Sequence, residues 1–180
     1  LFQTGYITIK NVDEGIYTFG YPNREVKTAF LEVLFHSYTE GLDDSGRFTL
    51  LSKHLRSENL DAFMETMTAI YASIPYALET HRDEAYFHTV FYLMVSASGI
   101  NASSEVLTCE GRIDLVMEFS DKVFIIEFKC NHGAAAAIKQ IRDRNYAQKF
   151  MQTAKKIILM GIDFSTEKRN ISEWKYEYLT

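Results

Sequence analysis

The sequence predicts a mixed α/β sandwich, in which helices cover a β-sheet, preceded by a small helical region. Two observations point to this class. Apolar residues recur at helical spacing in segments up to residue 98, and from residue 103 the spacing changes to the two-residue period of strands. A helical segment at 134–150 then separates strand-like segments, which gives the order helix, three strands, helix, two strands. Hydrophobic residues make up 47% of the 180 residues, which is enough for a core and excludes a disordered linker.

The region before the sheet is expected to contain one strand and two helices. Residues 2–9 carry β-branched and aromatic side chains at the density of a strand. A helix is expected over residues 23–38, with its first residue, an asparagine, as N-cap, and a Gly-Leu-Asp-Asp-Ser-Gly loop follows at 41–46. Ser57 is expected to cap a second helix, which ends before Pro75 because proline disfavours helical backbone in the preceding residue.

The second half begins with a longer helix from Asp83 to about Ala97, for which Gly99 is the natural stop. The elements expected after it are strands at 105–108, 112–119 and 123–129, a helix at 134–150, and strands at 157–164 and 173–179. The strand at 123–129 is nearly all apolar, so it should lie at the centre of the sheet with both faces covered.

We expect two regions, an N-terminal strand and helical subdomain at residues 1–81 and a sheet-containing domain at residues 82–180. The longest apolar run, residues 86–100, is interrupted by polar residues and is shorter than the ~20 residues of a membrane span, so it predicts a buried helix. Cys109 and Cys130 are too few for a disulfide scaffold, which favours a cytoplasmic protein with both thiols buried. The chain starts with leucine and lacks a signal-like segment, so we expect a piece of a longer protein.

Charge is unevenly distributed along the chain. The net formal charge of −5 excludes a uniformly basic coat protein. Residues 132–156 nevertheless carry a net charge of +5, because six Lys or Arg side chains accompany Asp143 alone. This basic helix could be only a solvated face. Beside a carboxylate cluster it also fits a phosphodiester substrate, which needs acids that hold a metal and bases that hold phosphate.

Charged residues interrupt the otherwise apolar central strand. Glu127 and Lys129 are two positions apart, so both side chains leave the same face of the sheet. Burial of such charges costs several kcal/mol each unless they are paired or hold a metal. The alternative is a simple Glu–Lys pair exposed at a strand end.

A second carboxylate is expected close to this pair. If the strands at 112–119 and 123–129 form a hairpin, Asp114 can lie near Glu127, and two such carboxylates repel each other unless a cation lies between them. Hard oxygen ligands suit Mg²⁺ that keeps several waters, with Mn²⁺ as a second possibility. Lys129 would then contact the phosphate or the attacking water.

Gly-Arg-Ile-Asp114, twelve further residues and then Glu127-Phe-Lys129 together resemble the active-site signature of the PD-(D/E)XK nuclease superfamily. The resemblance implies a restriction-endonuclease-like fold, a mixed β-sheet flanked by helices with an α-β-β-β-α-β core. Ile113 stands where the signature has proline, its least constant position. Over almost the whole chain, the sequence resembles the C-terminal part of bacterial AAA-ATPase-like proteins that carry such a nuclease domain.

The resemblance implies roles for five residues. Asp114 and Glu127 match the metal ligands, and Lys129 matches the catalytic lysine. Glu84 matches an acid that completes the metal site in some members, although it could be only a favourable acid in the first turn of a helix. Gln140 matches a glutamine that several branches keep near the site, although it could also be a surface residue.

These inferences lead to the hypothesis of a metal-dependent nuclease domain that hydrolyses phosphodiester bonds of nucleic acid, DNA rather than RNA, without a small-molecule cofactor. The residues expected to bind backbone phosphates are Lys139, Arg142, Arg144 and Lys149. No phosphate-binding Gly-x-x-x-x-Gly-Lys-Ser/Thr motif occurs in the sequence, so the implied ATPase domain would precede Leu1.

Two alternatives remain open. A catalytically idle domain could bind nucleic acid or a protein partner for an attached ATPase, although the complete set of Asp114, Glu127 and Lys129 argues against such decay. An interaction domain without a role in nucleic-acid binding would leave the basic segment unexplained. Salt-dependent binding of nucleic acid separates the last alternative from the others, and metal-dependent cleavage separates the nuclease from both.

Overall fold

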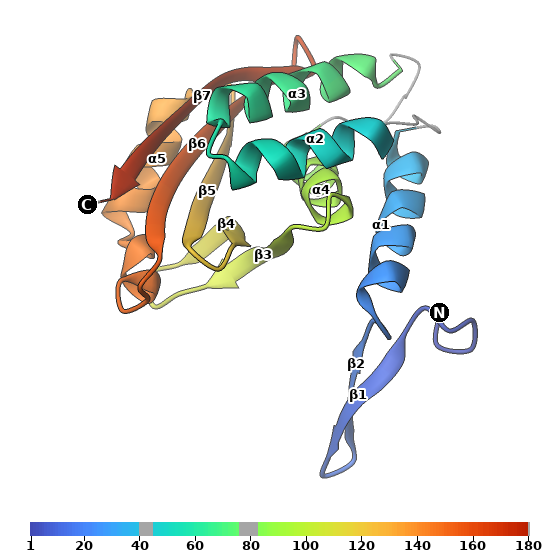
Figure 1. The fold of residues 1–180 in the computed structure, drawn as a ribbon. Coiled ribbons are helices and arrows are strands. Elements are labelled where there is room, and N and C mark those ends of the chain that lie inside the picture. Colours follow the sequence, from blue (N-terminus) through green and yellow to red (C-terminus); the bar gives the residue numbers. More distant parts are fainter. Residues whose placement is uncertain (40–44, 76–82, 180) are drawn as a thin grey trace.

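A five-stranded sheet forms the centre of the molecule in the computed structural model, which describes residues 1–39, 45–75 and 83–179 (Figure 1). Its strand order follows the chain, β3-β4-β5-β6-β7, and all neighbours are antiparallel except β5 and β6, which are parallel. The strands are β3 (Asn101–Leu107), β4 (Arg112–Glu118), β5 (Lys122–Cys130), β6 (Lys156–Ser165) and β7 (Asn170–Leu179). This is the mixed α/β arrangement expected from the sequence.

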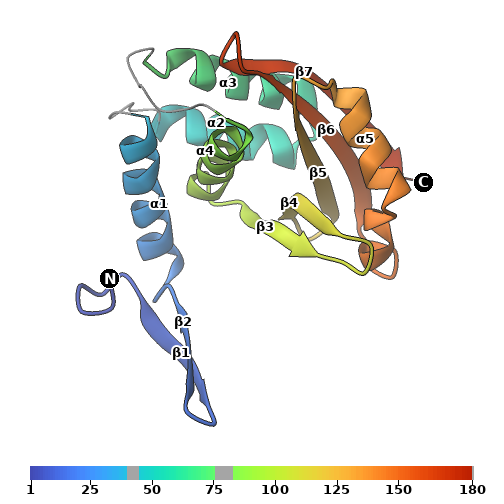
Figure 2. The same cartoon turned by 180° about the vertical axis from the view of Figure 1, so that it is seen from behind.

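Helices cover both faces of the sheet. Figures 1 and 2 show α5 (Ala134–Asp143) on one face. The other face is covered by α2 (Ser45–Arg56), α3 (Leu60–Ser73) and α4 (Glu84–Ala97). The parallel pair of β5 and β6 requires a crossover connection, which α5 and the short 3₁₀-helix η1 (Tyr146–Phe150) supply. Every β5 residue from Lys122 to Phe128 is buried, which confirms the prediction of a central strand covered on both faces.

The helix that precedes the sheet begins and ends where its sequence predicts. α4 spans Glu84–Ala97, and the Asp83 side chain accepts a hydrogen bond from the Tyr86 backbone N at 3.0 Å. Gly99 follows with φ of +73°, the left-handed conformation that ends many helices. In the described ranges, no helix is long and apolar enough to cross a membrane.

The N-terminal region differs from the prediction at its start. The strand expected at 2–9 is wrong, because β1 spans Thr8–Asp13 and pairs with β2 (Ile16–Gly20) in a hairpin. Glu14 and Gly15 both have positive φ, which is the geometry of a tight two-residue hairpin turn. The Glu-Gly pair that makes this turn was the available sequence signal.

Three further helices follow the hairpin: α1 (Arg24–Tyr38), α2 (Ser45–Arg56) and α3 (Leu60–Ser73). The predicted α1 is confirmed, and Asn23 caps it by accepting from the Val26 backbone N at 2.8 Å. The helix α2 was not predicted, and the predicted cap of α3 at Ser57 is wrong because Asn59 fills that role. The loop expected at 41–46 lies outside the described residues except for its last two positions, which belong to α2.

The helix expected at 134–150 is shorter than predicted. α5 ends at Asp143, and Asn145 adopts a left-handed backbone with φ of +46° before η1 begins. Asparagine tolerates this conformation better than most residues, which explains why the chain turns here. The expectation that both cysteines are buried is also wrong, since Cys109 is exposed and Cys130 is half-buried.

One buried cluster joins the N-terminal helices to the sheet. It runs from Leu31 and Phe35 of α1 through α3 and α4 to Phe128 and Phe164 of the sheet. A second cluster fills the space between the sheet and α5. The predicted boundary between residues 81 and 82 lies outside the described residues.

Candidate active site

Asp114 and Glu127 lie opposite each other where the β4–β5 ladder ends. The last pair in the register is Leu115 with Ile126, so the next positions on the two strands are Asp114 and Glu127. Beyond that pair the backbones no longer bond to each other. Instead, the Asp114 Oδ2 atom accepts a hydrogen bond from the Phe128 backbone N at 2.9 Å. The carboxylate of Asp114 is thereby fixed beside the end of β5.

Glu127 is 1% exposed and is the most deeply buried acid among the sequence-predicted site residues. Its Oε1 atom accepts hydrogen bonds from the Lys129 Nζ at 3.2 Å and from the Gln140 Nε2. Its Oε2 atom is buried without a hydrogen-bond partner. Burial, and next the negative charge of Asp114, raise the pKa of Glu127 to about 7.

Lys129 lies on the same side of β5 as Glu127 and contacts it directly. Its Nζ also donates to the Phe128 backbone oxygen at 3.0 Å, and its side chain is 20% exposed. The ammonium therefore has one side toward the carboxyl and another toward solvent. The structure brings Asp114, Glu127, Lys129 and Gln140 together, as their predicted grouping requires.

The approach of Gln140 to Glu127 depends on close packing of α5 against β6. Gly161 lies beside Glu127 in the parallel register, and a Cβ atom placed there would collide with the Ala134 backbone oxygen and lie 2.9 Å from the Ala137 Cβ. Glycine on the strand and alanine on the helix thus let the two backbones come together. This contact seats α5 so that Gln140 reaches the buried carboxyl.

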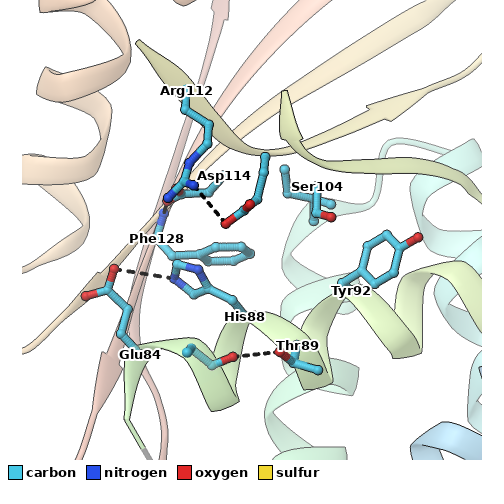
Figure 3. A pocket seen from close by; sticks show the side chains of 11 residues that line it. Glu84, His88, Thr89, Tyr92, Ser104, Arg112, Asp114 and Phe128 are labelled. Carbon is cyan, nitrogen blue, oxygen red and sulfur yellow. Dashed lines mark hydrogen bonds and ion pairs between the residues drawn. The ribbon is translucent and has the colours of Figure 1, made fainter. Parts of the chain in front are cut away.

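Asp114 also lines a cavity of about 430 Å³ between the sheet and α4, away from α5. Figure 3 shows Glu84, His88 and Thr89 projecting from α4 toward Arg112, Asp114 and Ser104 of the strands. We call this the Asp114 cavity. The carboxylate of Glu84 lies 3.8 Å from the His88 Nε2, so the predicted metal ligand on α4 enters the same cavity as Asp114.

His88 is held in an apolar setting within this cavity. Its ring lies 4.4 Å from the Phe128 ring, and its Nε2 atom is buried without a hydrogen bond. Burial lowers the pKa of His88, against the opposing charges of Asp114 and Glu84. The neutral imidazole is therefore the favoured form.

The donor set fits a hard divalent cation that keeps much of its hydration. In the part of the chain that the structure describes, no three His, Cys, Asp or Glu side chains converge on one point. Mg²⁺ commonly uses only one or two carboxylates together with waters and substrate phosphates. Asp114 and Glu127 supply two, and the Oε2 atom of Glu127 is buried without a hydrogen-bond partner. Glu84 lines the same cavity as Asp114 but forms no three-ligand cluster with this pair in the described residues.

The four basic residues predicted to bind phosphate all lie at the surface near α5, with Lys149 in η1. Their side chains are engaged with partners on the protein: Lys139 with Asp143, Arg142 with Glu177, Arg144 with the Glu110 backbone oxygen and Lys149 with the Leu107 backbone oxygen. Exposed contacts of this kind contribute little to stability and exchange readily. Lys139, Gln140 and Arg144 line a second hollow of about 500 Å³, which we call the α5 hollow.

Sequence analysis missed the acids that hold the start of α5. Asp163 of β6 accepts hydrogen bonds from the backbone N atoms of His132 and Gly133, both at 2.9 Å, and from the Ser172 hydroxyl at 2.6 Å. Glu173 of β7 accepts from the Ala134 backbone N at 3.0 Å. These two carboxylates satisfy the first N–H groups of a helix that has no side-chain cap of its own. Asp163 and Glu173 therefore position α5, which carries Gln140, and are not themselves part of the site.

The fold thus brings two carboxylates and a lysine together at the end of paired central strands. The family model of the PD-(D/E)XK nuclease superfamily matches residues 82–174, and the chain belongs to this superfamily. The matched range contains every residue of the grouping described above and has the restriction-endonuclease-like fold.

A longer protein is similar to nearly the whole of this chain. The chain is 32% identical over 190 residues to a protein of Azotobacter chroococcum mcd 1 named "Uncharacterized protein in vnfD 5'region". The match covers 99% of this chain but 37% of the relative, so the chain spans little more than a third of that protein.

Proposed function

We propose that this chain is a metal-dependent nuclease domain that hydrolyses phosphodiester bonds, with DNA as its preferred substrate. The observation that carries the proposal is the buried Oε2 of Glu127, a carboxylate oxygen without a partner, across from Asp114. A buried carboxylate oxygen without a hydrogen-bond partner costs stability, so a functional role explains it better than a structural one.

The metal would be Mg²⁺ or Mn²⁺, held by Asp114 and Glu127, with Glu84 as the side chain that could complete the site. Such an ion, when bound, supplies positive charge for the phosphoryl oxygens and lowers the pKa of a bound water. Because the pKa of Glu127 is about 7, this carboxyl must give up its proton before it can act as a ligand.

The remaining residues have roles that follow from their contacts. Lys129 directs its ammonium from Glu127 toward solvent, where it can hold a phosphoryl oxygen as charge develops there. Gln140 donates to Glu127 Oε1 and so orients the carboxyl while leaving Oε2 free. Lys139, Arg142, Arg144 and Lys149 would exchange their weak surface contacts for backbone phosphates.

We also propose that the longer protein contains an ATPase region attached to this domain. The sequence resemblance implies an ATPase region in a longer protein, and the relative from Azotobacter is long enough to contain further domains. A catalytically idle domain that serves such an ATPase is the second candidate. It is favoured by the absence of a third converging ligand among the described residues.

Cleavage of labelled single- and double-stranded DNA and RNA in Mg²⁺ or Mn²⁺ tests the proposal. We expect cleavage that EDTA, Lys129→Ala and Asp114→Asn each abolish, whereas Lys10→Ala, a change of one charge on the distant β1, keeps full activity. Calorimetric titration with Mn²⁺ provides a readout independent of turnover. Metal binding that Asp114→Asn removes, without cleavage of any substrate, would favour the idle domain, and neither binding nor cleavage would overturn the metal site.

A further inference from the structure

Arg112 lies at the junction of the two hollows beside the site. It lines both the Asp114 cavity and the α5 hollow, and among the lining residues of these two it is the one they share. It also stands two positions before Asp114 on β4, and its side chain is 55% exposed. A strand of nucleic acid that runs from the basic α5 hollow to Asp114 must therefore pass this guanidinium.

The backbone of Arg112 is fixed from the α5 side. The hydroxyl of Tyr146, a buried residue of η1, donates to the Arg112 backbone oxygen at 2.9 Å. Gly111, the preceding residue, lies against the same hydroxyl. The position of Arg112 is thus set by the packed connection that follows α5, which also carries Lys149.

The guanidinium is held by one carboxylate from the neighbouring strand. Arg112 Nη1 lies 3.2 Å from Glu105 Oε1, and both side chains are more than half exposed. An arginine carries five N–H donors in a planar fork, so within the described part of the chain this contact leaves most of them for another acceptor. Figure 3 shows the guanidinium at the rim of the Asp114 cavity.

Glu105 occupies an unusual backbone position. The β3–β4 register pairs Ser104 with Leu115 and Val106 with Ile113, which places Glu105 opposite Asp114. Its φ is +55°, a left-handed conformation that is uncommon for residues other than glycine. Backbone strain of this kind persists where the surroundings impose it, and it is frequent at functional sites.

We propose that Arg112, positioned by Glu105, binds the backbone phosphate next to the one that is cleaved and leads a single strand from the α5 hollow into the Asp114 cavity. The inference rests on the proposed nuclease for the identity of the substrate. The planar fork of arginine suits a phosphate, which accepts two parallel N–H bonds. Arg112 is then a substrate-binding residue, and Glu105 is a positioning residue.

Binding measured without cleavage tests this inference. We call Arg112 together with Glu105 the Arg112 clamp, or the clamp for short. Fluorescence anisotropy with a labelled single-stranded oligodeoxynucleotide and its duplex, in EDTA and over a series of NaCl concentrations, would compare the wild type with Arg112→Ala, Arg112→Lys, Glu105→Gln and Lys10→Ala. We expect Arg112→Ala to weaken binding about tenfold and to reduce the slope of log affinity against log salt by about one. Arg112→Lys should restore the slope but not the affinity, and Lys10→Ala should change neither.

Glu105→Gln distinguishes positioning from simple charge. The substitution removes a negative charge, so electrostatics alone would tighten binding to a polyanion, whereas a positioning role predicts weaker binding by about threefold. In a cleavage assay the same variant should raise KM more than it lowers kcat. Thermal melts of all variants check that the fold is kept.

The outcomes separate this inference from the proposed function. Expected changes in affinity without cleavage by the wild type would support the clamp and overturn the nuclease. Cleavage by the wild type together with unchanged affinity, salt slope and KM in Arg112→Ala would overturn the clamp alone. Wild-type protein that binds neither oligonucleotide would overturn both.

Discussion

Glu127 occupies a position in which a carboxylate is costly, and its surroundings show why the chain keeps it there. Its neighbours on β5 are apolar and buried, and a glutamine and a lysine both approach one of its two oxygens. The other oxygen is left without a partner. This arrangement suits the metal site proposed above, because a carboxyl whose two oxygens were both bonded by the protein would have none left for a cation.

Glu127→Gln should change how stability depends on pH. The pKa of Glu127 is about 7 in the folded chain against 4.5 for an ordinary glutamate, so between these values the folded state holds a proton that the unfolded state has lost. The free energy of unfolding therefore falls as pH rises from 4.5 to 7. The variant, which is neutral throughout, should match the parent near pH 4 and exceed it at pH 8 by on the order of 2–3 kcal/mol.

Urea unfolding in EDTA from pH 4 to 8 measures this difference. The exposed Glu65→Gln on α3 is a matched control and should run parallel to the parent. A Glu127→Gln curve that also runs parallel would show that folding does not raise the pKa of Glu127.

Gln140→Ala should move the pH dependence of cleavage to higher pH. The amide of Gln140 donates to Glu127 Oε1 and stabilises the ionised carboxyl, so its loss should raise the pKa of Glu127 further. We expect the acid limb of the kcat/KM profile to shift up by about half to one pH unit. The exposed Gln148→Ala of η1 serves as control, and an unshifted profile in Gln140→Ala would exclude an electrostatic role for this amide.

At the scale of elements, the seating of α5 on the sheet connects fold to site. The first turn of α5 lies against Gly161 of β6, and Asp163 and Glu173 from β6 and β7 accept its first N–H groups. The helix is therefore fixed at its N-terminal end by backbone proximity and charge. The position of Gln140, about two turns further along α5, depends on how this end of the helix is held.

Gly161→Ala should loosen this contact. The new Cβ would collide with the Ala134 backbone oxygen, which cannot rotate away as a side chain could, so α5 must shift. We expect a loss of about 1–3 kcal/mol in the free energy of unfolding, together with reduced cleavage as Gln140 moves from Glu127. Gly46→Ala in α2 is the matched control, because its Cβ would meet nothing within 4 Å. It should leave stability unchanged or raise it.

On the scale of the whole molecule, the N-terminal helices and the sheet share one hydrophobic core, while the β1–β2 hairpin projects away from it (Figure 2). Lys122 adds a polar link between the two regions. Its buried Nζ donates to the Arg56 backbone oxygen at 2.9 Å and pairs with Glu58 at 3.2 Å. The sheet face under α2 and α3 is therefore covered only while residues before 81 are present.

Removal of residues 1–81 should prevent the remainder from folding cooperatively. The isolated 82–180 fragment would expose Phe91 and other apolar side chains that now pack against α3, and it would lose the partners of Lys122. We expect loss of the near-UV circular dichroism signal and of a sigmoidal urea transition. Deletion of residues 1–20, which removes only the hairpin and the turns before it, should preserve both. A fragment that unfolds cooperatively would support residues 82–180 as an autonomous domain.

Much of this architecture could be predicted because local patterns carry it. The Asp83 cap and Gly99 stop delimit α4, and the apolar run of β5 places that strand at the centre. The helix α2 was not predicted, although Phe48, Leu51 and Leu55 have helical spacing. The hairpin was not predicted either, although Glu14 and Gly15 could have indicated a two-residue turn. In both cases the sequence pattern was present but covered only a few residues.

The sequence by itself determined the order of the elements along the chain, the helix that crosses between two of the strands, and the closeness of Asp114 to Glu127 and Lys129, because spacing on one strand and the turn between two strands are local properties. Only the tertiary structure decided that Gln140 and Lys129 donate to the same oxygen of Glu127, that the other oxygen stays unpartnered, and that Arg112 joins two hollows. These facts depend on how closely α5 approaches Gly161 and how β3 bends at Glu105. Packing between distant segments sets such distances, and no periodicity along the chain encodes them.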